Sequence, residues 1–196
     1  VLKALKEKQI PANLIPSVVE SVSKAWRKGV RVEANTYLSA TQSSAKTKHP
    51  ALNDLINLKG VAQNGIKVFV EQCAMCHQIK NEGIDFGPKL SEIGSKLSKE
   101  GMYLSILHPN AGIGFGYETF EITTKKGDVY QGIVTSKNET DIILKLPGGS
   151  IQNFKTSALK SVKQLDNSMM PDGLADGMST SELTDLVEYL STLKKK

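Results

Sequence analysis

The residues Cys73-Ala74-Met75-Cys76-His77 decide how the rest of this sequence is interpreted. They contain the only two cysteines of the 196-residue chain, separated by two residues and followed directly by a histidine. Two cysteines exclude the framework of several disulfides that small secreted proteins use. The two thiols and the imidazole are therefore expected to act together at one site.

The spacing C-x-x-C-H is the signature of covalent haem attachment. Two thiols three positions apart on a helical turn can both reach the vinyl groups of one porphyrin edge, and the next histidine can then give the iron an axial nitrogen. A thioredoxin-like dithiol or half of a zinc site are the alternatives. Neither fits, because no βαβ pattern surrounds the motif and no second cysteine pair exists. We expect one haem c per chain, bound by Cys73 and Cys76, with His77 as an iron ligand.

A methionine is the expected sixth ligand, as is common in cytochromes c. The sequence Ser-Met-Met-Pro-Asp-Gly, residues 168–173, supplies two candidates in a turn-rich stretch. Met170 is predicted to bind the iron because the following proline stiffens the backbone. Met169 is the rival, and both methionines could instead fill gaps in the core.

The other two histidines are not expected to bind the iron. His49 lies in a polar stretch and is predicted to be a surface residue. His108 stands between Leu107 and Pro109 beside a helix end, so it is predicted to be a cap or surface residue. A haem with two histidine ligands is the weaker alternative.

The sequence Gly-Pro-Lys-Leu, residues 87–90, is predicted to support the haem ligand His77. The second ring nitrogen of an iron-bound histidine needs an acceptor that fixes its orientation and basicity. The carbonyl of Pro88 is the predicted acceptor, and Leu90 is predicted to pack on the porphyrin. An ordinary turn without haem contact is the alternative.

Composition and charge are those of an ordinary globular protein. Charges interrupt every apolar run before it reaches the about 18 residues that a membrane span needs. The first residues, VLKALKEKQI, lack an initiator Met and an apolar leader, so we expect that an upstream part was removed. The basic excess lies in residues 1–60, where it is interpreted as a solvated helical surface and not as a nucleic-acid site.

Two parts are expected along the chain. Residues 1–60 are predicted to form helices, similar to the end of a HEAT-type repeat array, with a polar linker at 39–50 and a boundary near Gly60. Residues 61–196 are predicted to contain helices at 61–71 and 99–107, and a terminal helix capped by Thr180 or Ser181. Five short strands at about 116–165, separated by close turns, predict a small antiparallel sheet resembling an SH3-like barrel. The terminal helix is expected to bury Leu183, Leu186, Val187 and Leu190.

Residues 61–196 resemble a class I cytochrome c. The resemblance rests on the CAMCH motif at 73–77, the GPKL loop, the SMMPDGL turn at 168–174 and the ELTDLVEYL helix at 182–190. It implies a mainly α cytochrome c fold into which residues 105–135 and the following strands introduce an unusual β subdomain. That subdomain resembles one in the C-terminal haem-binding domain of membrane-bound dehydrogenases from planctomycetes and Bacteroidetes.

The resemblance implies an electron carrier that is not itself an enzyme, with no catalytic residues in this chain. It further implies a periplasmic or cell-surface location and a redox partner, either a separate protein or a fused dehydrogenase domain upstream. A haem-based gas sensor or peroxidase with a labile sixth ligand is the alternative function. A binding module in which the haem only stabilises the core is a third possibility.

Overall fold

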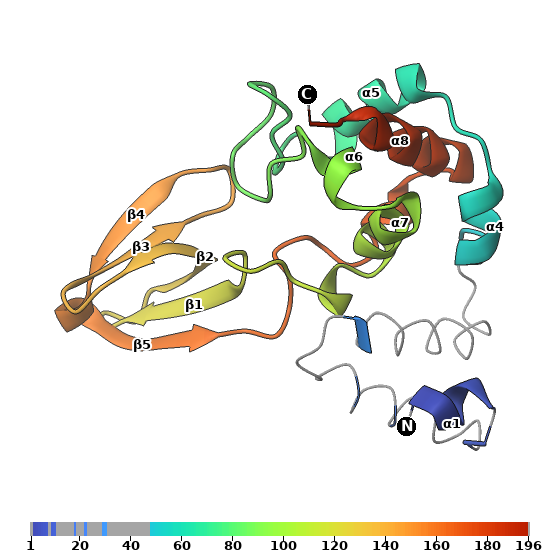
Figure 1. Cartoon of the computed structure of the whole chain (residues 1–196). Coiled ribbons are helices and arrows are strands. Elements are labelled where there is room, and N and C mark those ends of the chain that lie inside the picture. The colour runs from blue at the N-terminus through green and yellow to red at the C-terminus, as the bar shows by residue number, and fades with distance from the viewer. Residues whose placement is uncertain are drawn as a thin grey trace.

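The structure, a computed structural model, describes residues 2–7, 9–10, 18, 22, 29–30 and 48–195. Helix α1 (Leu2–Lys6) lies at the start of the predicted HEAT-like segment, and most of that segment and of the linker falls outside the described residues. Figure 1 shows a group of helices at one end and a β-sheet that projects away from them. No helix in the described ranges is both long enough and apolar enough to cross a membrane.

The three helices predicted after residue 60 are present, the last of them with a different cap, and the short helix at 93–96 was not predicted. The helices after residue 48 are α4 (Leu52–Asn57), α5 (Ala62–Gln72), α6 (Ile93–Lys96), α7 (Lys99–Leu107) and α8 (Thr180–Thr192), with 3-10 turns η2 (Pro109–Ala111), η3 (Thr156–Ala158) and η4 (Leu174–Gly177). The predicted cap of α8 was wrong, because Ser179 caps it. Its hydroxyl accepts from the Glu182 amide at 3.2 Å, and the Glu182 carboxylate accepts from the Ser179 amide at 2.7 Å.

Helices α5 and α8 cross at very short distance, and a glycine makes this possible. A Cβ atom on Gly65 would lie 2.1 Å from the carbonyl oxygen of Asp185 in α8. The Asp185 carboxylate also accepts a hydrogen bond from the amide of Val61, just before α5, at 2.6 Å. The rings of Phe69 and Tyr189 meet beyond the crossing, with centroids 6.2 Å apart. The two helices are thus fixed along their length.

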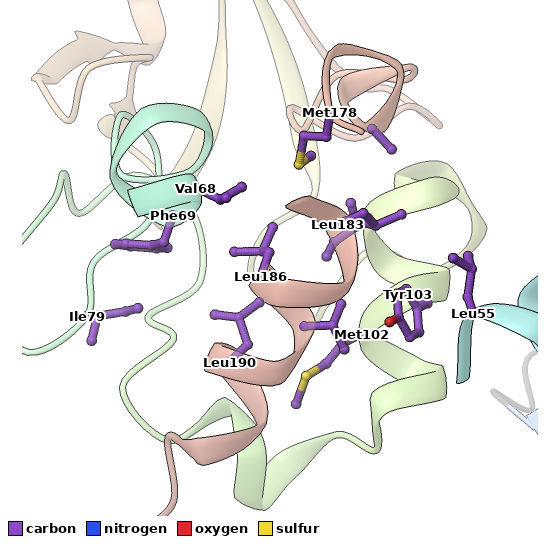
Figure 2. Packing of buried hydrophobic residues seen from close by; sticks show 13 residues of the cluster. Leu55, Val68, Phe69, Ile79, Met102, Tyr103, Met178, Leu183, Leu186 and Leu190 are labelled. Atoms are coloured by element: carbon purple, nitrogen blue, oxygen red, sulfur yellow. The ribbon is translucent and has the colours of Figure 1, made fainter. Parts of the chain in front are cut away.

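One hydrophobic cluster joins the helices (Figure 2). The predicted face of α8 is confirmed, since Leu183, Leu186 and Val187 are fully buried. Leu55 of α4 is also fully buried in this cluster. The boundary near Gly60 stays a prediction, but a helix before it contributes to the same core as α5 and α8.

The five predicted strands are confirmed and form one antiparallel sheet. They are β1 (Thr119–Thr124), β2 (Val129–Lys137), β3 (Asp141–Lys145), β4 (Ile151–Lys155) and β5 (Leu159–Gln164), in the spatial order β4-β3-β2-β1-β5. The sheet has its own buried cluster of Ile122, Ile142, Leu144 and Phe154. The chain enters and leaves the sheet at neighbouring points, because the amide of Leu165 donates to the Thr119 carbonyl at 2.8 Å. The sheet lies between α7 and α8 in the chain.

The close crossing predicts opposite effects for alanine at two helix glycines. Gly65→Ala should lower the free energy of unfolding by about 1–3 kcal/mol, because its methyl group would overlap the Asp185 backbone. Gly101→Ala in α7 is the matched control. A Cβ there meets only ordinary contacts at 3.6 Å, so it should raise stability by up to about 1 kcal/mol. Urea unfolding followed by circular dichroism measures both, and equal effects would contradict the close crossing.

Candidate functional site

The Cys73–His77 motif forms a tight turn at the end of α5. Cys73 is the C-cap of the helix, and its amide still donates to the Phe69 carbonyl at 2.9 Å. The amides of Cys76 and His77 both donate back to the Cys73 carbonyl, at 3.0 and 2.9 Å. Helix α5 therefore holds both thiols and the imidazole on one short, hydrogen-bonded stretch.

Cys73 and Cys76 both have intermediate exposure, and no disulfide joins them. Burial, together with a smaller contribution from the neighbouring Cys76, raises the pKa of Cys73 to about 12. Burial also raises the pKa of Cys76 above its usual value. Reactive dithiol motifs depend on a thiol pKa lowered below the ordinary value. The two thiols are thus protonated at neutral pH, which disfavours a thioredoxin-like role.

His77 makes the hydrogen bond that the sequence predicted. Its Nδ1 lies 2.8 Å from the carbonyl oxygen of Pro88. Because a carbonyl can only accept, Nδ1 carries the proton and Nε2 keeps its lone pair. Burial lowers the pKa of His77, and the Pro88 carbonyl opposes this shift. The imidazole is therefore neutral and in the tautomer that binds a metal through Nε2.

The loop after the motif wraps back around it. The amide of Ile84 donates to the Ala74 carbonyl at 2.8 Å, and the amide of Gly87 donates to the Cys76 carbonyl at 2.6 Å. A Cβ on Gly87 would lie 2.8 Å from Cε1 of His77. This close approach of the backbone to the imidazole was not predicted from the sequence, although a glycine beside Pro88 was a signal for it.

The sheet contacts the same loop. Nζ of Lys145, at the end of β3, lies 3.3 Å from Oδ1 of Asp85. The turn after β3 reaches the loop at Gly149, where a Cβ would lie 2.9 Å from the Ile84 side chain. These contacts join segments about sixty residues apart, so no local pattern in the sequence could indicate them.

Met170 borders the helical core. Its side chain is partly buried and packs against the same cluster as Cys73 and Leu90. Its amide donates to Oγ of Ser168 at 3.0 Å, which tightens the turn. In the described part of the chain, Met170 and not Met169 is the partner of this cluster. The geometry thus gives the two methionines different surroundings.

Two further features of the site region differ from, or were missing in, the sequence analysis. The prediction of a surface position for His49 was wrong, because its ring is buried against η4 and the start of α8. Nε2 lies 2.7 Å from the Ala175 carbonyl, and Nδ1 lies 3.3 Å from Oγ1 of Thr180.

His108 is confirmed as a cap, since it ends α7 and precedes η2. Asn110, which the analysis did not single out, bonds to both sides of the methionine turn.

The cytochrome c family model matches residues 62–144. This range contains α5, the cysteine motif, α6, α7, β1, β2 and all of β3 except its last residue. A comparison with curated proteins found no match. The match supports a c-type cytochrome, and cytochromes c carry covalently attached haem c with its iron. The predicted cofactor is therefore confirmed.

The residues of the site fit this group. Two protonated thiols lie on one turn, where they can form thioethers. The neutral imidazole of His77 keeps Nε2 free for the iron, and Gly87 leaves room beside the ring. No other side chain is needed for attachment.

Gly87→Ala should weaken the hydrogen bond from Nδ1 of His77 to the Pro88 carbonyl. The added methyl group would push against the ring, lower the basicity of the imidazole and so favour reduced iron. The reduction potential should rise, by about 59 mV for each tenfold loss of ferric over ferrous affinity. Spectroelectrochemistry measures the shift. The control is Gly114→Ala, where the nearest atom to a Cβ is 3.9 Å away, and a potential equal to this control would refute the steric argument.

Proposed function

We propose that this chain is a single-electron carrier whose haem is attached through Cys73 and Cys76 and ligated by His77 and Met170. The observation that carries the proposal is the hydrogen bond from His77 to Pro88, because it leaves Nε2 free to bind iron. Haem c supplies reversible one-electron chemistry when bound. The chain's own residues hold, orient and shield that group.

Each residue has one role in this proposal. Cys73 and Cys76 anchor the porphyrin edge, and the Pro88 carbonyl fixes the ring of His77 and raises its basicity. A thioether ligand from Met170 favours a higher potential than a second imidazole. Leu90 is partly buried against the helical cluster, and in this proposal it would pack beside the porphyrin and exclude water from that side. If His77 and Met170 both hold the iron, the haem would have no open site for a substrate.

We further propose that the electrons come from a dehydrogenase, either a partner protein or a domain fused upstream. The support is the sequence resemblance to haem-binding domains of membrane-bound dehydrogenases, together with the predicted HEAT-like segment before the cytochrome and the predicted SH3-like sheet inside it. The attachment of haem to C-x-x-C-H in such families takes place outside the cytoplasmic membrane. The proposed location is therefore the periplasm or the cell surface.

Met170→Ala should open the iron. The far-red band of methionine-ligated ferric haem should disappear, the reduction potential should fall, and carbon monoxide should bind rapidly to the reduced protein. Absorption spectra of both redox states and a carbon monoxide titration measure this. Met169→Ala is the matched control and should leave all three unchanged. If the wild-type protein already binds carbon monoxide rapidly, the sixth position is open, and the sensor or peroxidase function replaces electron transfer.

The proposed location can be tested with the same chain. Expressed with haem-maturation proteins, it should gain covalent haem only when an export leader precedes residue 1. Haem staining of a denaturing gel detects the covalent product. Equal staining of the chain without a leader would contradict an exported location.

A further inference from the structure

We propose that Asn110 is a positioning residue that holds Met170 at the iron by tying both sides of the methionine turn to the 3-10 turn η2, which follows helix α7. The methionine turn means residues 168–173. The inference rests on the proposed ligation by Met170.

The side-chain amide of Asn110 uses both of its functions on this turn. Oδ1 accepts a hydrogen bond from the backbone amide of Ser168 at 2.6 Å. Nδ2 donates to Oδ2 of Asp172 at 2.5 Å. The two partners lie two residues before and two residues after Met170. An asparagine suits this position because its amide offers an acceptor and a donor side by side.

The turn is also tightened from within. Oγ of Ser168 accepts from the Met170 amide at 3.0 Å, so the residue held by Asn110 in turn holds the methionine backbone. Pro171 restricts the next backbone angle. Gly173 adopts a left-handed conformation with φ of +74°, which directs the chain away into η4. The methionine therefore stands on a short segment that Asn110 fixes at both ends.

Asn110 connects this segment to the core that carries the other ligand. It lies in η2, directly after α7, whose residues Met102, Tyr103 and Ile106 are buried in the helical cluster. Cys73, at the start of the turn that bears His77, packs against the same cluster. The hydrogen bonds of Asn110 thus relate the position of Met170 to that of His77 through one rigid core.

The position matters because of what precedes the turn in the chain. Strand β5 ends at Gln164 and belongs to the sheet, which has a separate hydrophobic cluster. Any motion of the sheet relative to the helices would therefore also move the methionine turn. The hydrogen bonds of Asn110 restrain the turn against such motion, because they hold it to η2 and the helical core.

Displacement of Met170 by imidazole in the oxidised, haem-loaded protein tests the role. The rate depends on how often the methionine leaves the iron. Asn110→Ala should raise it about tenfold or more, the factor expected for the loss of one charge-assisted hydrogen bond. Asn138→Ala is the matched control, because its Oδ1 also accepts backbone hydrogen bonds, from Thr140 and Asp141, but in the turn between β2 and β3. Its rate should equal that of the wild-type protein.

An exchanged pair separates positioning from general loss of stability. Asn110→Asp alone keeps the acceptor for Ser168 but places a carboxylate against Asp172, so displacement should accelerate. Combining it with Asp172→Asn restores one donor and one acceptor, and should return the rate to near the wild-type value. This pair also decides the question if Asn110→Ala fails to fold.

The outcomes distinguish this inference from the function on which it rests. If Met170→Ala opens the iron but the Asn110 variants match the Asn138 control, the positioning role is overturned and the ligand assignment stands. If Met170→Ala leaves the spectrum unchanged, the ligand assignment itself fails. Acceleration by Asn110→Asp with no rescue in the exchanged pair also overturns the role.

Discussion

The crossing of α5 and α8 is the contact on which the rest of the site depends. Gly65 lets the two backbones approach, and Asp185 adds hydrogen bonds to the start of α5. The cysteine turn follows α5, and the methionine turn comes shortly before α8. One helix contact therefore brings together two segments that lie almost one hundred residues apart in the sequence.

Each side of the site is then fixed by a different set of weak interactions. On the histidine side, the loop at 84–88 bonds back to the cysteine turn, and the sheet contacts that loop through Lys145 and Gly149. On the methionine side, Asn110 and Ser168 hold the turn. Each contact is modest, since most of these side chains are partly exposed. Together they define one arrangement of His77 and Met170, the two proposed ligands.

The elements that the sequence predicted are those with a local signal. The C-x-x-C-H spacing, the alternating strands and the apolar face of α8 each lie within one segment, and the structure has the corresponding elements. The capping box Ser179-x-x-Glu182 was also a local signal, but Thr180 and Ser181, the next two residues, were the predicted caps. The Pro88 carbonyl could be predicted because an iron-bound histidine needs an acceptor.

The features that the sequence did not predict depend on distant partners. His49 stands in a polar stretch, and only its bonds to Ala175 and Thr180 explain its burial. Asn110 resembles an ordinary turn residue until Ser168 and Asp172 are seen beside it. Polarity of the neighbours is a poor guide when the hydrogen-bond partners lie more than fifty residues away.

The hydrogen bond between Leu165 and Thr119 has a consequence for the entropy of the chain. It places the start and the end of the sheet segment side by side, so the two points at which the chain leaves and re-enters the helical part lie close together. The cost of closing a loop grows only slowly with its length, by about 0.6 kcal/mol for each doubling. Within the sheet, β-ladder pairs and a separate apolar cluster offset the ordering of its residues. The segment between α7 and the methionine turn, which contains the whole sheet, therefore adds little more to the entropic cost of folding the helices than a short loop would.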